Sequence, residues 1–278
     1  MARILGIGDN TIDMYVDHGV QYPGGNGINV AVMSRRLGAQ ASYLGCIGND
    51  DLGDIIRDML KSEKIDTSQM RRIDYPNAWT RIKHNGNDRM FDGSNPTMEG
   101  MYNLTARDFD YIAAHDLTHG CLYGKLDNDL ADISRAAPIL SFDYADEFSS
   151  DYLDKTAQHV DIAFLSNPGA SEEACEQLCR EVATRGPSTV VVTRGDQGSM
   201  AYDRNKFYKQ GIVSGHIVDT LGAGDGLIAG FLVAHLNGAT LSEALQKGAE
   251  NATFVCGYRG GLGYESKIKP DQAGLSKN

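Results

Sequence analysis

The chain has 278 residues, a formal net charge of −11 and an isoelectric point near 5.0. Folds of the α/β class often reach this length as one unit, so we expect a single domain over residues 1–278. The negative charge argues against a partner that binds a basic patch, such as nucleic acid or an anionic membrane surface. The five cysteines form no CxxC motif, and neither a signal peptide nor an 18-residue apolar run is seen, which predicts reduced thiols and a cytoplasmic location.

Strand and helix patterns alternate along most of the chain. This order is typical of a parallel sheet covered by helices. The run TVVVT at residues 189–193 is typical of a strand that is buried on both faces. The expected elements are strands at 3–8, 41–47, 139–143, 162–166 and 189–193, a hairpin at 199–210, and helices at 29–37, 51–63, 105–114, 171–185, 225–237 and 241–256.

Two segments interrupt this alternation with antiparallel strand signals. Residues 11–22 alternate apolar and polar side chains, and residues 78–93 show the same pattern on either side of Asn85-Gly86, a strong hairpin signal. These strands are expected to form a small lid beside the main sheet. Their free edges would be covered if two copies paired, so we expect a homodimer through the lid.

The segment DTLGAGD, from Asp219 to Asp225, directly precedes an apolar helix pattern. A Gly-x-Gly at a helix start leaves backbone N–H groups uncovered at the positive end of the helix dipole, where an anion can bind. Asp225 would lie close enough to take a proton from a hydroxyl that attacks a bound phosphate. An Asp at this position is more often a simple N-cap, but the neighbouring glycines favour the catalytic interpretation.

A second glycine-rich segment, GGNGINVA at residues 24–31, also leads into a helix. Glycines permit a ligand to approach the backbone, and the amides of Asn26 and Asn29 can both donate to and accept from sugar hydroxyls. A plain glycine-rich turn is the alternative. The third segment, TRGDQGS at residues 193–199, leaves the carboxyl end of a buried strand, where open α/β sheets bind ligands such as nucleotides.

Other patterns carry less information. Gly6-x-Gly8 lacks the third small residue of the dinucleotide fingerprint, and no GxxxxGK[ST] loop exists. His115 and His119 lie four residues apart. We interpret them as packing at a helix end rather than binding a metal.

In this order and spacing, the three segments resemble those of the ribokinase-like sugar kinases of the phosphofructokinase-B type, over nearly the whole chain. Residues 219–225 match that family's D-T-x-G-A-G-D signature at every fixed position. The resemblance implies a ribokinase-like three-layer α/β/α fold with a mainly parallel central sheet and a small β-strand lid. It also implies a kinase that uses ATP and Mg²⁺ to phosphorylate a sugar hydroxyl.

The resemblance, together with the motifs, assigns roles to individual residues. The family's Asn-x-x-Glu element near the metal is altered here, because Asn167 is present but the Glu is displaced to Glu172 or Glu173. The candidate catalytic residues are Asp225, Gly222, Ala223 and Gly224. The candidate sugar ligands are Asp13, Gly25, Asn26 and Asn29. The candidate ATP ligands are Asn167, Thr193, Gly195, Gly198 and Asn251. The candidate metal ligands are Glu172 and Glu173.

Within the family, the short length and the sequences GDNTIDMY, GGNGINVAV and NGNDRMF look most like the fructoselysine 6-kinases, which act on Amadori compounds. A zwitterionic amino-acid group needs a cation and an anion nearby, and Arg89 and Asp92 on the lid hairpin could supply them. Solvated charges on a lid edge are the alternative. Two other functions stay open: a kinase for a plain sugar or nucleoside, and a non-catalytic sugar or nucleotide sensor.

Overall fold

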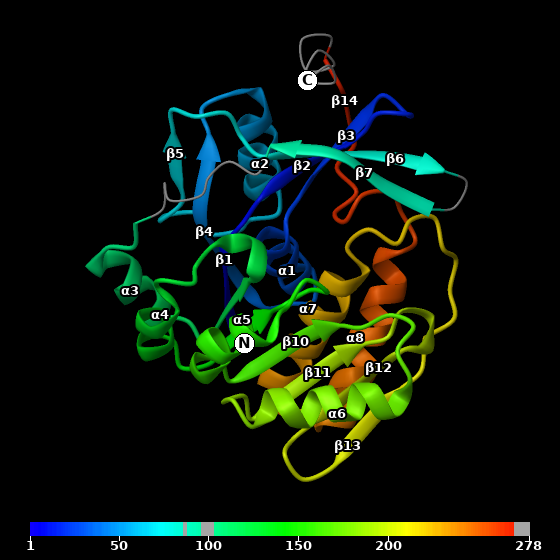
Figure 1. The fold of residues 1–278 in the computed structure, drawn as a ribbon. Helices are drawn as coiled ribbons and strands as arrows, with labels where there is room; N and C mark the ends of the chain where they lie inside the picture. Colours follow the sequence, from blue (N-terminus) through cyan, green and yellow to red (C-terminus); the bar gives the residue numbers. More distant parts are fainter. Residues whose placement is uncertain (86–87, 96–102, 270–278) are drawn as a thin grey trace.

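Figure 1 shows the computed structural model, in which residues 1–85, 88–95 and 103–269 are described. The strands of its central sheet are β1 (Arg3–Gly8), β4 (Gln40–Gly48), β5 (Arg71–Ile73), β8 (Leu117–Cys121), β9 (Leu140–Asp143), β10 (Ile162–Ser166), β11 (Thr189–Thr193), β12 (Ser199–Tyr202) and β13 (Phe207–Gln210). Their order is β13-β12-β11-β10-β9-β8-β1-β4-β5. Every pair from β11 to β5 is parallel, and β12 and β13 add an antiparallel hairpin at one edge.

Helices cover both faces of the central sheet, each face with its own hydrophobic core. They are α1 (Asn26–Arg36), α2 (Asp51–Ser62), α3 (Ala106–Ala113), α4 (Leu130–Ala136), α5 (Ser150–Thr156), α6 (Glu172–Ala183), α7 (Ala223–Leu236) and α8 (Leu241–Val255), with 3₁₀ turns at Leu122–Gly124, Ala157–His159 and Gly195–Gln197. On β11, Val191 packs in the core with α1, α2, α7 and α8, whereas Val190 and Val192 pack in the core with α3 to α6. Alternate side chains of one strand thus enter opposite cores, as the apolar run predicts.

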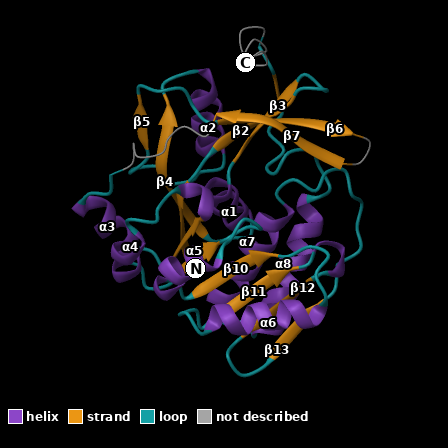
Figure 2. Ribbon diagram, viewed as in Figure 1, coloured by secondary structure: helices purple, strands orange, loops and turns teal. Residues whose placement is uncertain are grey.

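A second, smaller sheet forms the lid. Its strands are β2 (Thr11–Tyr15), β3 (Val20–Gly24), β6 (Trp79–Asn85), β7 (Asp88–Asn95) and β14 (Ser266–Lys267), in the order β14-β3-β2-β6-β7. The expected strands near 11–22 and 78–93 are therefore present, although the tip of the second hairpin, residues 86–87, lies outside the described residues. Figure 2 shows the lid strands gathered at the top of the view. Because two residues separate β1 from β2, the lid rises from the carboxyl end of β1.

The helices of the described residues are all short. None of them is long and apolar enough to cross a membrane.

Candidate active site

The anion site predicted at residues 222–224 is the start of helix α7. Gly222 is the N-cap residue with a φ of 79°, and no side chain caps the helix. The Ala223 N–H donates to the Thr220 carbonyl at 3.2 Å, within the turn that leads into the helix. A Cβ on Gly224 would meet no atom within 4 Å, so the approach to the first turn is open. An anion can therefore reach the positive end of the α7 dipole.

Asp225, in the first turn of α7, is held by two amides of helix α1. Asn26 Nδ2 donates to Asp225 Oδ1 at 2.8 Å, and Asn29 Nδ2 donates to Oδ2 at 2.6 Å. Burial raises the pKa of Asp225 to about 6, the charge of Asp9 adds to the increase, and the two amide hydrogen bonds oppose it. The carboxyl is therefore mostly deprotonated at neutral pH, and its pKa suits a proton acceptor.

The glycine-rich segment before α1 fixes how that helix begins. Gly25 has a φ of 107°, and a Cβ at this position would lie 2.6 Å from the Asn10 Cα, so only glycine fits. Asp9, between β1 and the lid, accepts the N–H groups of Asn26 and Gly27 at 2.9 and 3.0 Å. A carboxylate from the connection after β1 thus satisfies the start of α1 and orients its first residue.

Asp143, the last residue of β9, is a further carboxyl at this edge that the sequence motifs did not indicate. Its Oδ2 accepts an N–H from Asn26 at 2.9 Å, and its Oδ1 accepts the Ala145 N–H at 3.0 Å. Burial raises the pKa of Asp143 to about 7, and the charges of Asp225 and Asp9 add to the increase. We call Asp9, Asp143 and Asp225 the carboxyl cluster. It lies at the carboxyl ends of the parallel strands, where open α/β sheets bind ligands.

The lid presents Asp13 toward the anion site. Asp13 lies in β2, is 7% exposed, and precedes Tyr15 by two residues, so the two side chains share one face of the strand. The Tyr15 hydroxyl donates to Asp219 Oδ2 at 2.5 Å, close to the start of α7. A Cβ on Gly24 would lie 2.5 Å from the Asp13 carboxylate, so the glycine leaves room for this side chain. The predicted sugar ligand Asp13 thus lies on the lid face that is directed at the anion site.

Asp92 lies on the other face of the lid. It forms ion pairs with Arg81 at 2.9 Å and with Lys83 at 2.7 Å, and these cations lower its pKa. Arg81 pairs in register with the residue next to Asp13 in β2, and successive side chains of a strand alternate between faces. The structure therefore does not bring Asp92 to the side of the lid that carries Asp13. The side chain of Arg89 lies outside the described part of the structure.

The loop predicted to bind nucleotide phosphates follows β11. Thr193 ends the strand, and its carbonyl accepts the Asn167 N–H at 2.9 Å, which joins this loop to the end of β10. Gly195 begins the 3₁₀ turn and Gly198 follows it. The Nε of Arg194 is buried and has no hydrogen-bond partner. A buried cationic donor without an acceptor fits an anionic ligand such as a phosphate.

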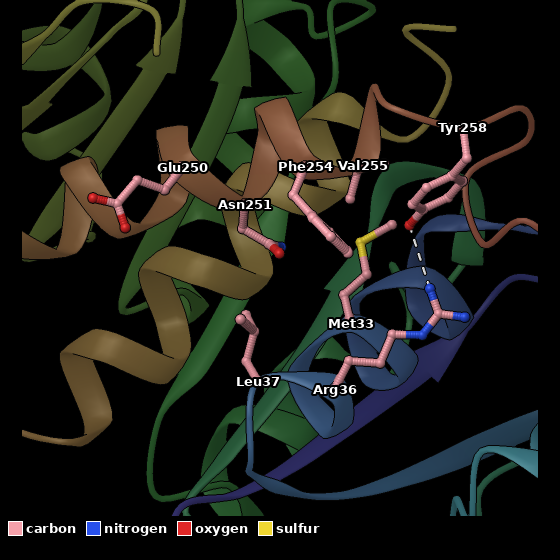
Figure 3. A pocket seen from close by; sticks show the side chains of 8 residues that line it. All are labelled: Met33, Arg36, Leu37, Glu250, Asn251, Phe254, Val255 and Tyr258. Carbon is pink, nitrogen blue, oxygen red and sulfur yellow. Dashed lines mark hydrogen bonds between the residues drawn. The ribbon is translucent and has the colours of Figure 1, made fainter. Parts of the chain in front are cut away.

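Asn251 ties helix α8 to the start of α7. Its Nδ2 donates to the Gly226 carbonyl at 2.8 Å, and the residue is 9% exposed. Asn251 lines a hollow of about 470 Å³ between α1 and α8, together with Met33, Phe254 and Tyr258. Figure 3 shows how these side chains lie around it. This hydrogen bond gives Asn251 a role in packing α7 against α8, which positions the anion site.

Glu172 and Glu173 begin helix α6 and contact groups outside the carboxyl cluster. Lys209 Nζ lies 2.5 Å from Glu172, and Arg194 lies 3.7 Å from it. Hydrogen bonds from the backbone and from Ser171 lower the pKa of Glu173. Among the described residues, no group of three His, Cys, Asp or Glu side chains is arranged to hold a metal ion. Mg²⁺ usually binds through one or two carboxylates together with the phosphates of a substrate. The two carboxylates of Glu172 and Glu173 therefore fit a metal that arrives with a nucleotide.

Comparisons with known proteins place the chain among kinases. The sequence matches the profile of the pfkB family carbohydrate kinases over residues 5–266. It is similar to fructosamine kinase FrlD of Bacillus subtilis, with 36% identity over 280 residues that cover 99% of this chain and 98% of that protein. It is also similar to fructoselysine 6-kinase of Escherichia coli, with 31% identity over 260 residues that cover 94% of this chain and 99% of that protein.

Solved structures share the fold. Arabidopsis thaliana ribokinase complexed with ribose and ATP gives a TM-score of 0.83 at 19% identity, and the comparison covers 100% of both chains. The nucleoside kinase of Methanocaldococcus jannaschii gives a TM-score of 0.76 at 21% identity, with 94% of both chains covered. These likenesses confirm the expected ribokinase-like α/β/α fold with its β-strand lid. Because the family match spans most of the sequence, the chain belongs to the pfkB family of carbohydrate kinases.

Proposed function

We propose that the chain phosphorylates a hydroxyl of a fructosamine, such as fructoselysine at its 6-position, with ATP as the donor. The relatives named fructosamine kinase and fructoselysine 6-kinase, which align over nearly the whole chain, support this substrate class. The observation that carries the chemistry is Asp225, a carboxyl with a pKa of about 6 that Asn26 and Asn29 hold at the uncapped start of α7. A proton acceptor and an anion site therefore lie side by side at the start of α7.

In the proposed phosphoryl transfer, each residue of the site has its own role. The acceptor hydroxyl lies under the lid between Asp13 and Asn29. It gives its proton to Asp225 as its oxygen bonds to the γ-phosphorus of ATP, and the bond from that phosphorus to the leaving ADP breaks. Asn29 Oδ1 is buried without a hydrogen-bond partner, so it is free to accept a hydrogen bond from a sugar hydroxyl. The backbone at residues 222–224 stabilises charge on the transferring phosphoryl group.

ATP is placed along the loop after β11, with its phosphates directed at the start of α7. The unpaired Nε of Arg194 and the contact between Asn167 and Thr193 support this location. When bound, Mg²⁺ would offset the negative charge of the ATP phosphates during the transfer. Glu172 and Glu173, at the start of α6 near this loop, are the carboxylates proposed for the water shell of the metal.

The chain is also proposed to work as one kinase domain in the cytoplasm. The family match over residues 5–266 supports one kinase domain across this part of the chain. All five cysteines are buried, and in the described part of the structure none is joined in a disulfide, which fits a reducing compartment.

The substrate assignment predicts selectivity for acceptors that carry an ammonium group. Asp9, Asp143 and Asp225 make the site acidic, and an acidic site favours a cationic acceptor over a neutral one. With Mg-ATP, we expect kcat/KM for fructoselysine and related fructosamines to exceed that for fructose, ribose and adenosine by at least about tenfold, or ~1.4 kcal/mol. ADP release across this panel of acceptors measures the ratio.

The same panel separates the other functions. Turnover restricted to a plain sugar or to adenosine would preserve the kinase chemistry and reject the fructosamine. Tight sugar binding without any ADP release would instead favour a non-catalytic sensor.

We propose that two copies associate through their lids. Strands β7 and β14 are the outermost strands of the lid sheet. Edge strands carry N–H and C=O groups that a second copy can cover across a two-fold axis. Light scattering at micromolar protein should therefore give about twice the 30.1 kDa mass of one chain. A mass of a single chain at that concentration would reject the dimer.

A further inference from the structure

A buried histidine connects to the carboxyl cluster through Asn26. His119 lies in β8 and is 0% exposed. Its Nδ1 lies 2.8 Å from Ser141 Oγ, and its Nε2 lies 2.9 Å from Asn26 Oδ1. Burial lowers the pKa of His119 to about 3, so the ring is neutral at neutral pH. One ring nitrogen therefore donates a hydrogen bond and the other accepts one.

The other partners of Asn26 decide which nitrogen carries the proton. Asn26 Nδ2 lies 2.9 Å from Asp143 Oδ2 and 2.8 Å from Asp225 Oδ1. The amide NH₂ group must face these two carboxyl oxygens, so Asn26 Oδ1 faces His119. An oxygen accepts, and Nε2 of His119 is therefore the donor while Nδ1 accepts from the Ser141 hydroxyl. Both polar atoms of the Asn26 side chain are therefore hydrogen-bonded within the protein. Its NH₂ group donates to the two carboxyls rather than to a sugar hydroxyl.

We propose that His119 is a positioning residue for the catalytic base. By donating one hydrogen bond to Asn26 Oδ1, it fixes the amide so that Asp143 and Asp225 both receive an N–H. Without this donor the amide can turn over and place its oxygen against two carboxyl oxygens. That arrangement removes two donors and adds repulsion, so Asp225 would ionise less readily and lose its fixed position. The inference rests on the proposed role of Asp225 as the base.

Other ionisable groups near this network include Asp9, Cys121 and Asp146, and the charge of Asp146 also raises the pKa of Asp143. Asp9 accepts the Asn26 backbone N–H at 2.9 Å and the Cys121 thiol at 3.2 Å. Burial raises the pKa of Cys121 well above its usual value, so this thiol stays neutral over the pH range of an assay. Burial also raises the pKa of Asp143 to about 7 and that of Asp225 to about 6. These two carboxyls share one amide, so they titrate as a pair near neutral pH.

The test compares two variants of the full-length enzyme. His119→Phe removes the donor, whereas the side-chain NH₂ of His119→Gln can replace the Nε2–H. With Mg-ATP and the best acceptor of the panel, His119→Phe is expected to lower kcat about 10–100-fold at an unchanged KM for ATP. It should also move the acidic limb of kcat/KM, near pH 6 in the wild type, upward by about one pH unit. His119→Gln should keep the wild-type limb and a kcat within about fivefold of the wild type.

His115 provides the matched control. It is also buried, at 7% exposed, and its Nε2 lies 2.7 Å from Ser42 Oγ, but its hydrogen bonds do not reach the carboxyl cluster. His115→Phe should lower the melting temperature without moving the pH profile. Equal kinetic losses in both Phe variants, or an unshifted acidic limb in His119→Phe, would overturn the proposal.

A third variant covers the case in which His119→Phe does not fold. Ser141→Ala removes the hydroxyl that selects the Nε2–H tautomer, so it should shift the acidic limb in the same direction by a smaller amount. An unshifted limb in Ser141→Ala would then count against the positioning role. The base assignment is separate: it fails if Asp225→Asn keeps wild-type turnover. If Asp225→Asn is inactive while His119→Phe is normal, only the positioning role fails.

Discussion

Replacing Asp225 with asparagine is expected to lower kcat about 10²–10⁴-fold while the KM for ATP stays within about threefold of the wild type. An amide cannot take the proton of the acceptor hydroxyl, whereas the open first turn of α7 is left in place to bind phosphate. Mg-ATP-dependent ADP release, measured at saturating acceptor and ATP, gives the change in kcat. Turnover close to that of the wild type would remove Asp225 from the role of base.

The melting temperature of the same variant separates lost chemistry from lost structure. Burial raises the pKa of Asp225 from 3.8 to about 6, so the folded state binds more protons than the unfolded state between these values. Ionising this carboxyl therefore costs stability as the pH rises through about 6, and asparagine removes that cost. Against this, one hydrogen bond from Asn26 or Asn29 is lost. At pH 8 we expect the melting temperature to stay within about 3 °C of the wild type. A much larger fall would mean that the lost activity reports unfolding.

The proposed base and the proposed anion site could be predicted because they come from one short segment. Residues 219–225 carry the glycines, the helix start and the carboxyl together, so no knowledge of the sheet is needed to see that they cooperate. Gly25 and Asn29 were predicted as sugar ligands from a similarly short segment. Their hydrogen bonds and close contacts follow from the way a glycine-rich segment enters α1.

Asp143 and His119 could not be found in this way, because strand register brings them to the site. The spacing of His115 and His119 predicts that both pack at a helix end. This is confirmed for His115, whose ring lies 2.7 Å from the Tyr111 carbonyl at the end of α3, but it is wrong for His119, because residues 117–121 form strand β8 between β1 and β9. The sequence LTHGC contains polar side chains and a glycine, which hide a fully buried strand. His119 pairs in register with Ser141 on β9, two residues before Asp143. Only the sheet order shows that these side chains meet.

In the lid too, a local sequence signal predicts one feature, whereas another depends on how strands pair. The Asn-Gly signal predicted the hairpin, but the face on which Asp92 lies depends on the pairing of β6 with β7. That pairing shifts register between Thr80 and Ile82, where β7 carries an extra residue. Because one residue of shift moves a strand side chain to the opposite face, the position of Asp92 could not be deduced from alternation alone.

Gly222→Ala is expected to have the second large effect, a fall in kcat of at least about 100-fold. The φ of 79° at this position disfavours alanine, and a Cβ there would lie 2.8 Å from the Cα of Gly261. One of the two backbone segments must therefore move. Gly261 is also next to Asn29, since a Cβ on Gly261 would lie 3.1 Å from Asn29 Nδ2. The movement would disturb both the N–H groups that start α7 and the amide that holds Asp225.

Gly238→Ala is the matched control because Gly238 follows the other end of α7, with a φ of 88°, and a Cβ there would meet no atom within 4 Å. Both alanines carry similar backbone strain, so both variants should lose about 1 kcal/mol of stability from this source. Thermal denaturation measures that loss, and ADP release measures kcat. If both variants lost turnover together, backbone strain would be the cause. If turnover falls only in Gly222→Ala, the backbone strain that the two variants share cannot account for the difference. The start of α7 is then where the transferring phosphoryl group is bound.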